Sequence, residues 1–222
     1  MEIVSLYGTG GHASVVLDTL RARDVIVDNV FDDAGNAAFF GGRRIQPGVF
    51  SSGDSCVDRD GTAVIICIGA NAVRADVAAK LHTDFATSVH PSATVGDNGA
   101  LGSGTVVFHG AVVERGVRIG RHVIVNTAAW VGERCDLEDF VHISPQAHVG
   151  EGARIEEGAH IGAAARIAPG VRVGAWTTIG AGTVVTSDVA AHRTVVGSPA
   201  RVLHDRSGQK LPKYHRIRSR AA

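Results

Sequence analysis

The segment NTAAWVGERCDLEDFVH, residues 126–142, carries side chains of the types that exchange protons with a substrate. Glu133 and Arg134 stand side by side, and His142 closes the segment. A carboxylate or an imidazole can act as a general base, but a neighbouring guanidinium lowers the pKa of a carboxylate from its ordinary value of about 4.3. Glu133 is therefore a candidate base whose strength depends on burial. A surface ion-pair ladder with Arg134, Arg115 and Glu151 is the alternative.

Aliphatic residues recur at every sixth position around and beyond this segment. A period of six fits neither an α-helix nor an alternating strand. It predicts a solenoid of short parallel strands, three to a triangular coil, so that residues 18 apart stack about 4.8 Å from one another. The positions expected to point inward are Val89, Val95, Leu101, Val107, Val113, Ile119, Val125, Val131, Leu137, Ile143, Val149, Ile155, Ile161, Ile167, Val173, Ile179 and Val185.

This pattern resembles that of the hexapeptide-repeat acyltransferases, and the resemblance is specific for the fold. It implies a left-handed parallel β-helix over residues 87–203. A small or β-branched residue two positions before each aliphatic one, and a frequent glycine just after it, suit the tight corners of such a coil. The second half of the chain is therefore expected to be one continuous all-β domain.

The first half lacks the period of six and has the pattern of alternating strands and helices. A Gly-rich turn, GTGGHA, joins its first strand to its first helix, where backbone N–H groups could hold a phosphate. The pattern predicts an α/β, Rossmann-like βαβ domain at residues 1–86. Its size favours a mononucleotide or nucleotide sugar over a dinucleotide, and a turn that serves only packing is the alternative. The expected strands are 2–7, 25–31 and 62–69, and the expected helices are 14–23 and 71–81.

The order of motifs along the whole chain is more informative than either half. A GxGGH turn, two aspartates after the second strand, IGxN after the third and then hexapeptide coils resemble the sialic-acid O-acetyltransferase and nucleotide-aminosugar N-acetyltransferase family. The resemblance implies that the first domain binds a nucleotide-linked sugar and that the β-helix binds acetyl-CoA between neighbours in a homotrimer. It implies substrate contacts at Gly10, Gly11, His12, Asp32, Asp33, Gly69 and Asn71, with Arg74 as a further candidate and turn capping as the alternative for His12.

The catalytic segment of that family is altered in this chain. Family members typically have NTxxx(V/I)(D/E)H(D/E)C followed by FxH(I/V)S, and the first histidine is the general base. Here Glu133 stands at the position of that histidine and Arg134 at the position of its acidic helper. Three hypotheses remain. Glu133 is the base; or the sugar amine, with a pKa nearer about 8 than lysine's 10.4, attacks the thioester without a strong base; or the site no longer transfers an acyl group.

The resemblance also implies the contacts with the cosubstrate. His142 occupies the position that contacts acetyl-CoA, where an imidazole N–H could polarise the thioester carbonyl. Ala163, Gly180 and Gly182 lie in Gly- and Ala-rich coils that suit a pantetheine arm bonded to backbone amides. Another coil histidine could supply a replacement base from a neighbouring subunit. No metal is expected, because the spacing of the histidines follows the repeat itself.

Composition limits the remaining choices. The 22 basic and 22 acidic residues balance, so charge gives no argument for binding nucleic acid or a membrane surface. No stretch approaches the roughly 18 apolar residues that span a bilayer. The three dispersed cysteines are typical of a reduced, cytoplasmic protein. Residues 204–222 form a basic tail that could reach the 3′-phosphate of CoA or extend into solvent.

Together these features predict an acetyl-CoA-dependent N-acyltransferase that acetylates the amine of a nucleotide-linked amino sugar. O-acetylation of a sugar or sialic acid, and a catalytically silent ligand-binding homologue, are the alternatives. Loss of the family histidine favours an amine acceptor, because a hydroxyl is a poor nucleophile without a base.

Overall fold

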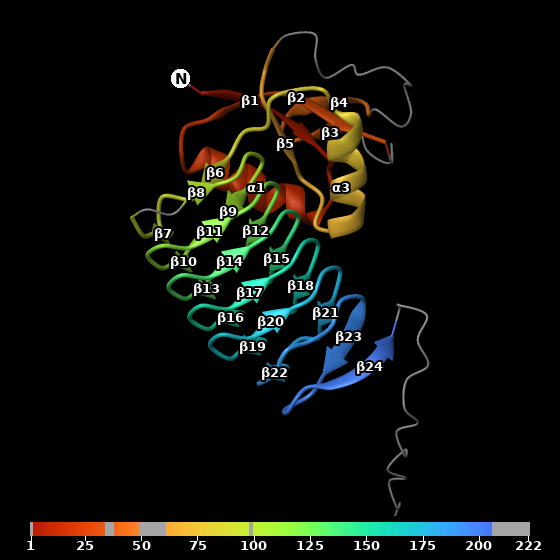
Figure 1. The fold of residues 1–222 in the computed structure, drawn as a ribbon. Helices are drawn as coiled ribbons and strands as arrows, with labels where there is room; N and C mark the ends of the chain where they lie inside the picture. Colours follow the sequence, from red (N-terminus) through yellow and green to blue (C-terminus); the bar gives the residue numbers. More distant parts are fainter. Residues whose placement is uncertain (1, 34–37, 49–60, 98–99, 206–222) are drawn as a thin grey trace, which may run out of the picture.

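The computed structural model describes residues 2–33, 38–48, 61–97 and 100–205. They form an α/β part that lies across the first coils of a left-handed parallel β-helix, which confirms the predicted fold class (Figure 1). Cys56 and the basic tail from Arg206 onward lie outside the described residues. Within the described ranges, no helix has both the length and the apolar character needed to cross a membrane.

Five strands form the sheet of the α/β part, in the order β3-β4-β2-β1-β5. β1 (Ile3–Tyr7), β2 (Ile26–Asp32) and β5 (Val64–Ile66) are the expected strands, and β1 pairs in parallel with both of the others. β1 and β5 are almost continuous runs of buried residues, as strands covered on both faces should be. The sequence pattern does not predict the other two strands, β3 (Phe39–Phe40) and β4 (Arg43–Pro47).

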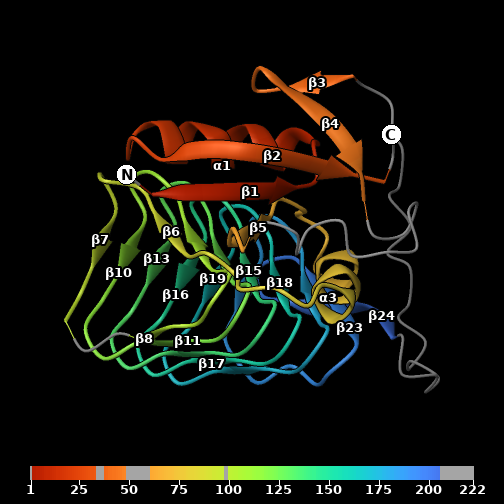
Figure 2. The same cartoon turned by 90° about the horizontal axis from the view of Figure 1, so that it is seen from above.

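Two helices lie beside this sheet. α1 (Gly11–Arg21) follows β1 and runs alongside β1 and β2 over the first coils, and α3 (Asn71–Lys80) follows β5 (Figure 2). Val16 and Leu20 of α1 share one buried core with Val106, Phe108 and Ile124 of the coils. This common core fixes the α/β part on the β-helix.

Each predicted aliphatic position from 89 to 185 is the second residue of a two-residue strand. The strands are β6 (Ser88–Val89), β7 (Thr94–Val95), β8 (Ala100–Leu101), β9 (Val106–Val107), β10 (Val112–Val113), β11 (Arg118–Ile119), β12 (Ile124–Val125), β13 (Trp130–Val131), β14 (Asp136–Leu137), β15 (His142–Ile143), β16 (His148–Val149), β17 (Arg154–Ile155), β18 (His160–Ile161), β19 (Arg166–Ile167), β20 (Arg172–Val173), β21 (Thr178–Ile179) and β22 (Val184–Val185). The chain then adds an antiparallel pair, β23 (Arg193–Val196) and β24 (Arg201–Asp205).

These strands align into three sheets, which we call the first, second and third faces. The first face contains β6, β9, β12, β15, β18 and β21 and continues into β23 and β24; the second contains β7 to β22 and the third β8 to β20, each at every third strand. Stacked partners are 18 residues apart, as His142 and His160 are, which confirms the predicted coil repeat. Val131, Leu137 and Ile143 are at most 1% exposed and show how one residue from each face fills the interior.

The turns between faces form three corners, and their positions matter for the site. The first–second corner contains the turns at 126–129, 144–147, 162–165 and 180–183. The second–third corner contains 132–135 and 150–153, and the third–first corner contains 120–123, 138–141 and 156–159.

Candidate active site

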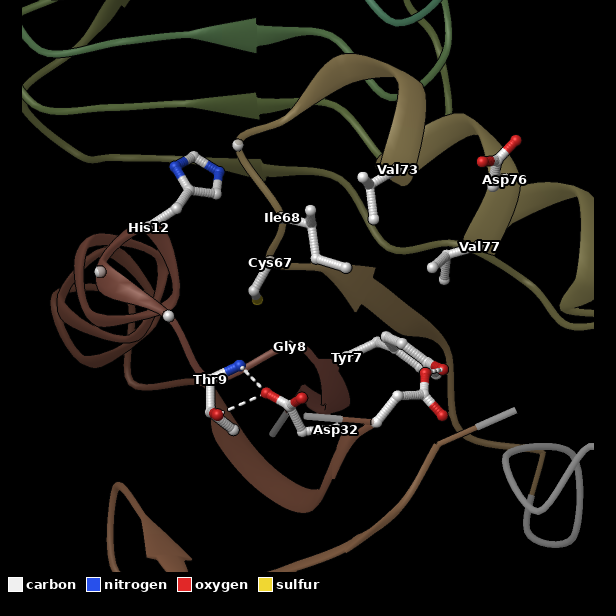
Figure 3. A pocket seen from close by; sticks show the side chains of 14 residues that line it. Tyr7, Gly8, Thr9, His12, Asp32, Cys67, Ile68, Val73, Asp76 and Val77 are labelled. Carbon is white, nitrogen blue, oxygen red and sulfur yellow. Dashed lines mark hydrogen bonds between the residues drawn. The ribbon is translucent and has the colours of Figure 1, made fainter. Parts of the chain in front are cut away.

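A cavity of about 500 Å³ opens at the carboxyl ends of β1, β2 and β5, between the start of α1 and the side of α3 (Figure 3). β2 and β5 lie on opposite sides of β1, and ligands of open parallel sheets bind at such a reversal of strand order. The cavity brings together six of the seven predicted substrate residues: Gly10, Gly11, His12, Asp32, Asp33 and Gly69. Its other lining residues are Tyr7, Gly8, Thr9, Cys67, Ile68, Val73, Asp76 and Val77.

The Gly-rich turn shapes the floor of the cavity. Gly8 has φ +103°, and a Cβ there would lie 2.9 Å from Ile68 Cγ1, so both conformation and space require glycine. Gly10 precedes α1 with extended φ and ψ and offers no side-chain cap, and the first turn of α1 contains no acidic residue. The first N–H groups of α1 therefore lack a carboxylate partner in that turn, which suits an anionic ligand.

Two carboxylates stand at the end of β2. Asp32 Oδ2 accepts hydrogen bonds from the backbone N–H of Thr9, at 2.7 Å, and from the Thr9 hydroxyl. Asp33 accepts a hydrogen bond from the hydroxyl of Tyr7, whose ring is buried. These contacts fix both carboxylates against the Gly-rich turn, where they can accept further hydrogen bonds from the N–H or O–H groups of a ligand.

Asn71 lies outside the cavity, contrary to its predicted substrate contact. Its Nδ2 donates to the carbonyls of Gly158 and Ala159, at 3.0 and 3.2 Å, and its Oδ1 accepts a hydrogen bond from Arg74. Both amide atoms are thus committed to joining α3 to the third–first corner. A partner 87 residues away along the chain leaves no local sequence signal.

Arg74 has the same structural role. Its guanidinium is 1% exposed and donates to carbonyls of both parts of the molecule: those of Ile68, Gly69, His122 and Phe140. Burial lowers the pKa of Arg74 to about 9. Among the described residues, the hydrogen-bond partners of this cation are all neutral, so its positive charge acts on the histidines around it.

His142 lies at the junction of the two parts, beneath the Gly69 loop. The backbone N–H of Thr127 donates to Asn126 Oδ1 at 2.8 Å, which leaves the Asn126 Nδ2 hydrogens facing His142 Nε2, 3.1 Å away. Nε2 must accept that hydrogen bond, so the ring proton is on Nδ1, which donates to the carbonyl of Gly69 at 3.3 Å. Burial, with the positive fields of His160, Arg74 and His12, lowers the pKa of His142 to about 3.

This hydrogen-bond arrangement differs from the one that the predicted role of His142 requires. The ring has no N–H left to polarise a thioester carbonyl, because its single proton bonds to Gly69. His160 stacks on His142 with ring centroids 4.9 Å apart, and its Nε2 is 2.9 Å from the hydroxyl of Ser144. Burial and the charge of Arg74 also lower the pKa of His160.

His12 connects the cavity to this group of histidines. Its ring makes an edge contact with Phe108, at 5.3 Å between centroids, and lies 6.2 Å from the ring of His142. His12 Nε2 is buried and has no hydrogen-bond partner among the described residues. Burial, followed by the charge of Arg74, lowers the pKa of His12 to about 4, so the ring is neutral at pH 7.

Glu133 lies elsewhere. It belongs to the second–third corner, whereas His142 is on the first face and the cavity is in the α/β part. Its carboxylate is 53% exposed and pairs with Arg134 at 3.1 Å, and Arg134 also pairs with Glu151 from the next coil. Within one chain, the structure thus shows the part of the predicted ladder formed by Glu133, Arg134 and Glu151, and Glu133 and His142 lie on different sides of the coil.

The predicted cosubstrate residues share one edge of the β-helix. Ala163, Gly180 and Gly182 all belong to the first–second corner, and the N–H of Gly182 donates to the carbonyl of Ala163 at 2.8 Å. Asn126 lies on the same corner two coils earlier. A continuous edge therefore runs from the Gly- and Ala-rich coils to the group of His142 and His12.

Sequence reasoning missed several residues of the site. Thr9 and Tyr7 hold the two aspartates, and Phe108 packs against His12. Thr9 sits inside the Gly-rich turn, so its position gave a usable signal. Phe108 is one of the few aromatic residues on the coils, but its contact with the first helix follows only from the packing of the two parts.

Comparison with known proteins agrees with this architecture. Residues 4–81 match the PglD N-terminal domain, and residues 152–187 match the bacterial transferase hexapeptide repeats. A curated relative, UDP-N-acetylbacillosamine N-acetyltransferase of Bacillus subtilis (strain 168), is 33% identical over 125 residues, which is 49% of this chain. That match spans about half of the relative, 52% of its length.

Solved structures match over nearly the whole chain. Perosamine N-acetyltransferase from Caulobacter crescentus, solved as a mutant with CoA and GDP-perosamine, is 30% identical, with a TM-score of 0.85 over 92% of this chain and 98% of its own. The acetyltransferase domain of PglB from Neisseria gonorrhoeae is 32% identical, with a TM-score of 0.83 over 91% of this chain and 100% of its own. The chain therefore belongs to the nucleotide-aminosugar N-acetyltransferase family of hexapeptide-repeat proteins.

Proposed function

We propose that this protein transfers an acetyl group from acetyl-CoA to the amine of a nucleotide-linked amino sugar. The observation that carries the proposal is the position of His12, which lines the cavity and whose ring lies against those of Phe108 and His142 on the coils. An acceptor bound in the cavity would present its sugar at the edge where a thioester would lie. Buried, unpaired Cys67 and Cys135 also agree with a cytoplasmic protein.

The nucleotide end of the acceptor would bind in the α/β part. A diphosphate suits the uncapped N-terminus of α1 at Gly10 and Gly11, where the dipole and free N–H groups favour negative charge. Asp32 and Asp33 would accept hydrogen bonds from the base or ribose. The perosamine N-acetyltransferase bound to GDP-perosamine and CoA supports a ligand pair of this kind.

The cosubstrate would lie along the first–second corner. Its pantetheine arm would bond to backbone groups near Ala163, Gly180 and Gly182, where small side chains leave the backbone accessible. We propose that the protein is a homotrimer and that a second copy of the chain forms the other wall of this cosubstrate site. The second–third corner that contains Glu133 lies away from the cavity of its own chain. The arrangement of the copies would therefore determine whether Glu133 comes near the site of a neighbour.

The chemistry asks little of a base when the acceptor is an amine. A sugar amine flanked by electron-withdrawing oxygens should have a pKa near 8, so a useful fraction is neutral at pH 7.5. The neutral nitrogen attacks the thioester carbonyl carbon, and the C–S bond breaks to release CoA. A hydroxyl is a poor nucleophile until a base removes its proton. The absence of the family histidine therefore favours N-acetylation.

The test is thiol release from acetyl-CoA with a panel of acceptors. GDP-perosamine and a UDP-linked amino sugar are compared with the same sugars carrying hydroxyl groups in place of the amine. We expect release only with the amines. Release only with hydroxyls would establish O-acetylation instead, and CoA binding without turnover on any acceptor would favour the silent homologue.

A further inference from the structure

We infer that His12, from the Gly-rich turn of the α/β part, is the proton acceptor of the acetyl transfer. The inference rests on the proposed function and deepens it by naming a catalytic residue. It follows from a comparison of four candidate groups: Glu133, His142, His160 and His12.

Glu133 is the wrong side chain by position and environment. Its carboxylate is half exposed, it pairs with Arg134, and its corner is separated from the first–second corner by the whole second face. Arg134 is shared with Glu151, so the glutamate belongs to a surface ladder of charges. Such a carboxylate is held by surface ion pairs and lies outside the cavity of its own chain.

His142 and His160 lie nearer, but both ring nitrogens of His142 and Nε2 of His160 are engaged in hydrogen bonds. Asn126 donates to His142 Nε2, and the carbonyl of Gly69 accepts the Nδ1 proton. Taking up a further proton would break the bond with Asn126, which Thr127 holds in one orientation. His160 Nε2 bonds to Ser144, one coil beyond. These two rings are thus suited to shaping the site rather than to accepting a proton.

His12 is the imidazole that lines the cavity and has an unpaired nitrogen. Its ring is held between Phe108 and His142, so it stands where the acceptor cavity meets the coils. Buried polar atoms without a partner are rare in folded proteins and often mark functional positions. The ring is neutral at pH 7 and therefore has a lone pair to offer.

The reaction then balances with no further reactant. The sugar amine attacks the carbonyl carbon of acetyl-CoA and forms the new C–N bond, which leaves the nitrogen with one proton too many. A ring nitrogen of His12 takes that proton as the C–S bond breaks. The imidazolium gives the proton to the departing thiolate, so CoA leaves as the thiol and His12 returns to its neutral form.

The variant His12→Asn tests the inference, with His82→Asn as the matched control because His82 is exposed and lies outside the cavity. Turnover of acetyl-CoA with GDP-perosamine and a UDP-linked amino sugar is measured from pH 6 to 9, and the Kd of each acceptor is measured by calorimetry. We expect His12→Asn to lower kcat at least 100-fold at pH 7, with the acceptor Kd changed less than 3-fold, and added imidazole to restore part of the rate.

Other results would overturn the inference in distinguishable ways. A His12→Asn enzyme with full kcat and a weaker Kd would make His12 a binding residue, and the proposed function would stand. Loss of kcat without rescue by imidazole, and with an unchanged pH profile, would make it a positioning residue. A wild-type protein that acetylates none of the amines would overturn the proposed function and this inference together.

Discussion

Arg134 forms ion pairs with two carboxylates, and this sharing bears on the contribution of Glu133 to stability and catalysis. Arg134 pairs with Glu133 of its own coil and with Glu151 of the next, and all three side chains are at least half exposed. Exposed pairs of this kind contribute about 0.2–1 kcal/mol, because water screens them and the long side chains lose freedom. The two glutamates are therefore near equivalents in the structure, although only Glu133 occupies the family's catalytic position.

This equivalence gives a prediction for Glu133→Gln, with Glu151→Gln as its control. We expect both variants to keep kcat within about 3-fold of wild type and to change the free energy of unfolding by less than about 1 kcal/mol. Steady-state acetyl transfer and urea denaturation measure the two quantities. A loss of 100-fold in kcat for Glu133→Gln alone would show that the glutamate works in the site of a neighbouring copy.

At this scale the sequence predicted which residues line the cavity better than it predicted their protonation and hydrogen-bond partners. The Gly-rich turn and the aspartates after β2 line the cavity because strand ends and turns carry local signals. The proton position on His142 depends on Asn126, Thr127 and Gly69, which no spacing rule connects. Asn71 follows its strand as expected, but its partners on the coils turn it away from the cavity.

Among the elements, α3 is attached to the β-helix through buried polar contacts as well as apolar packing. The Arg74 guanidinium bonds to the Gly69 loop on one side and to the carbonyls of His122 and Phe140 on the other. Those two residues are on successive coils at the third–first corner, and both have left-handed φ values, 53° and 59°. The corner thereby presents its carbonyls to one cation, and α3 is placed relative to the cavity it borders.

Removing this cation should be costly. Arg74→Met would take the donor away from the carbonyls of Ile68, His122 and Phe140 and from Asn71 Oδ1, at a junction where the Arg74 side chain is buried, so we expect a loss of about 3 kcal/mol or more in the free energy of unfolding. Arg74→Lys keeps the charge but not the geometry of the hydrogen bonds. Its free energy of unfolding should lie between those of wild type and Arg74→Met. Urea denaturation is the measurement, and Arg21→Met, which removes an exposed i,i+3 ion pair with Asp18, is the control. Equal midpoints for Arg74→Met and Arg21→Met would contradict the role given to Arg74.

The elements differ in how well the sequence predicts them. The coils follow from one repeated choice of residue, so every strand of the β-helix up to β22 lies where the pattern predicts. β3 and β4 have no comparable pattern: β3 has only two residues, and β4 is mostly exposed. The place of β4 in the sheet depends on its pairing with β2, and that of β3 on its pairing with β4, rather than on a buried face of their own.

On the scale of the whole molecule, the outward-facing residues of the first face are apolar where the α/β part covers this face and polar beyond it. Val106 and Ile124 lie beneath α1 and are apolar, whereas His142, His160 and Thr178 follow in the same column beyond it. The change from aliphatic to imidazole marks the boundary between packing and site. A sequence repeat shows the column, but its meaning appears only once α1 is in place.

The same burial makes the fold sensitive to acid. His12, His122 and His142 have pKa values of about 4, 4 and 3 in the folded protein, because burial disfavours their charged forms. In the unfolded chain a histidine titrates near 6.5. The unfolded state therefore binds more protons between these values, and the stability present above about pH 6.5 is lost progressively as the pH falls towards 4.

His12→Asn gives this argument a quantitative test that is independent of catalysis. A histidine whose pKa falls from about 6.5 to 4 on folding should lose about 2 kcal/mol of stabilisation between pH 7 and pH 5. The variant has no such group, so its loss of stability over this interval should be about 2 kcal/mol smaller than that of wild type, whatever its stability at pH 7. Urea denaturation at the two pH values measures the difference, with His82→Asn again as the exposed control. An unchanged pH dependence in His12→Asn would contradict the lowered pKa of His12 in the folded protein.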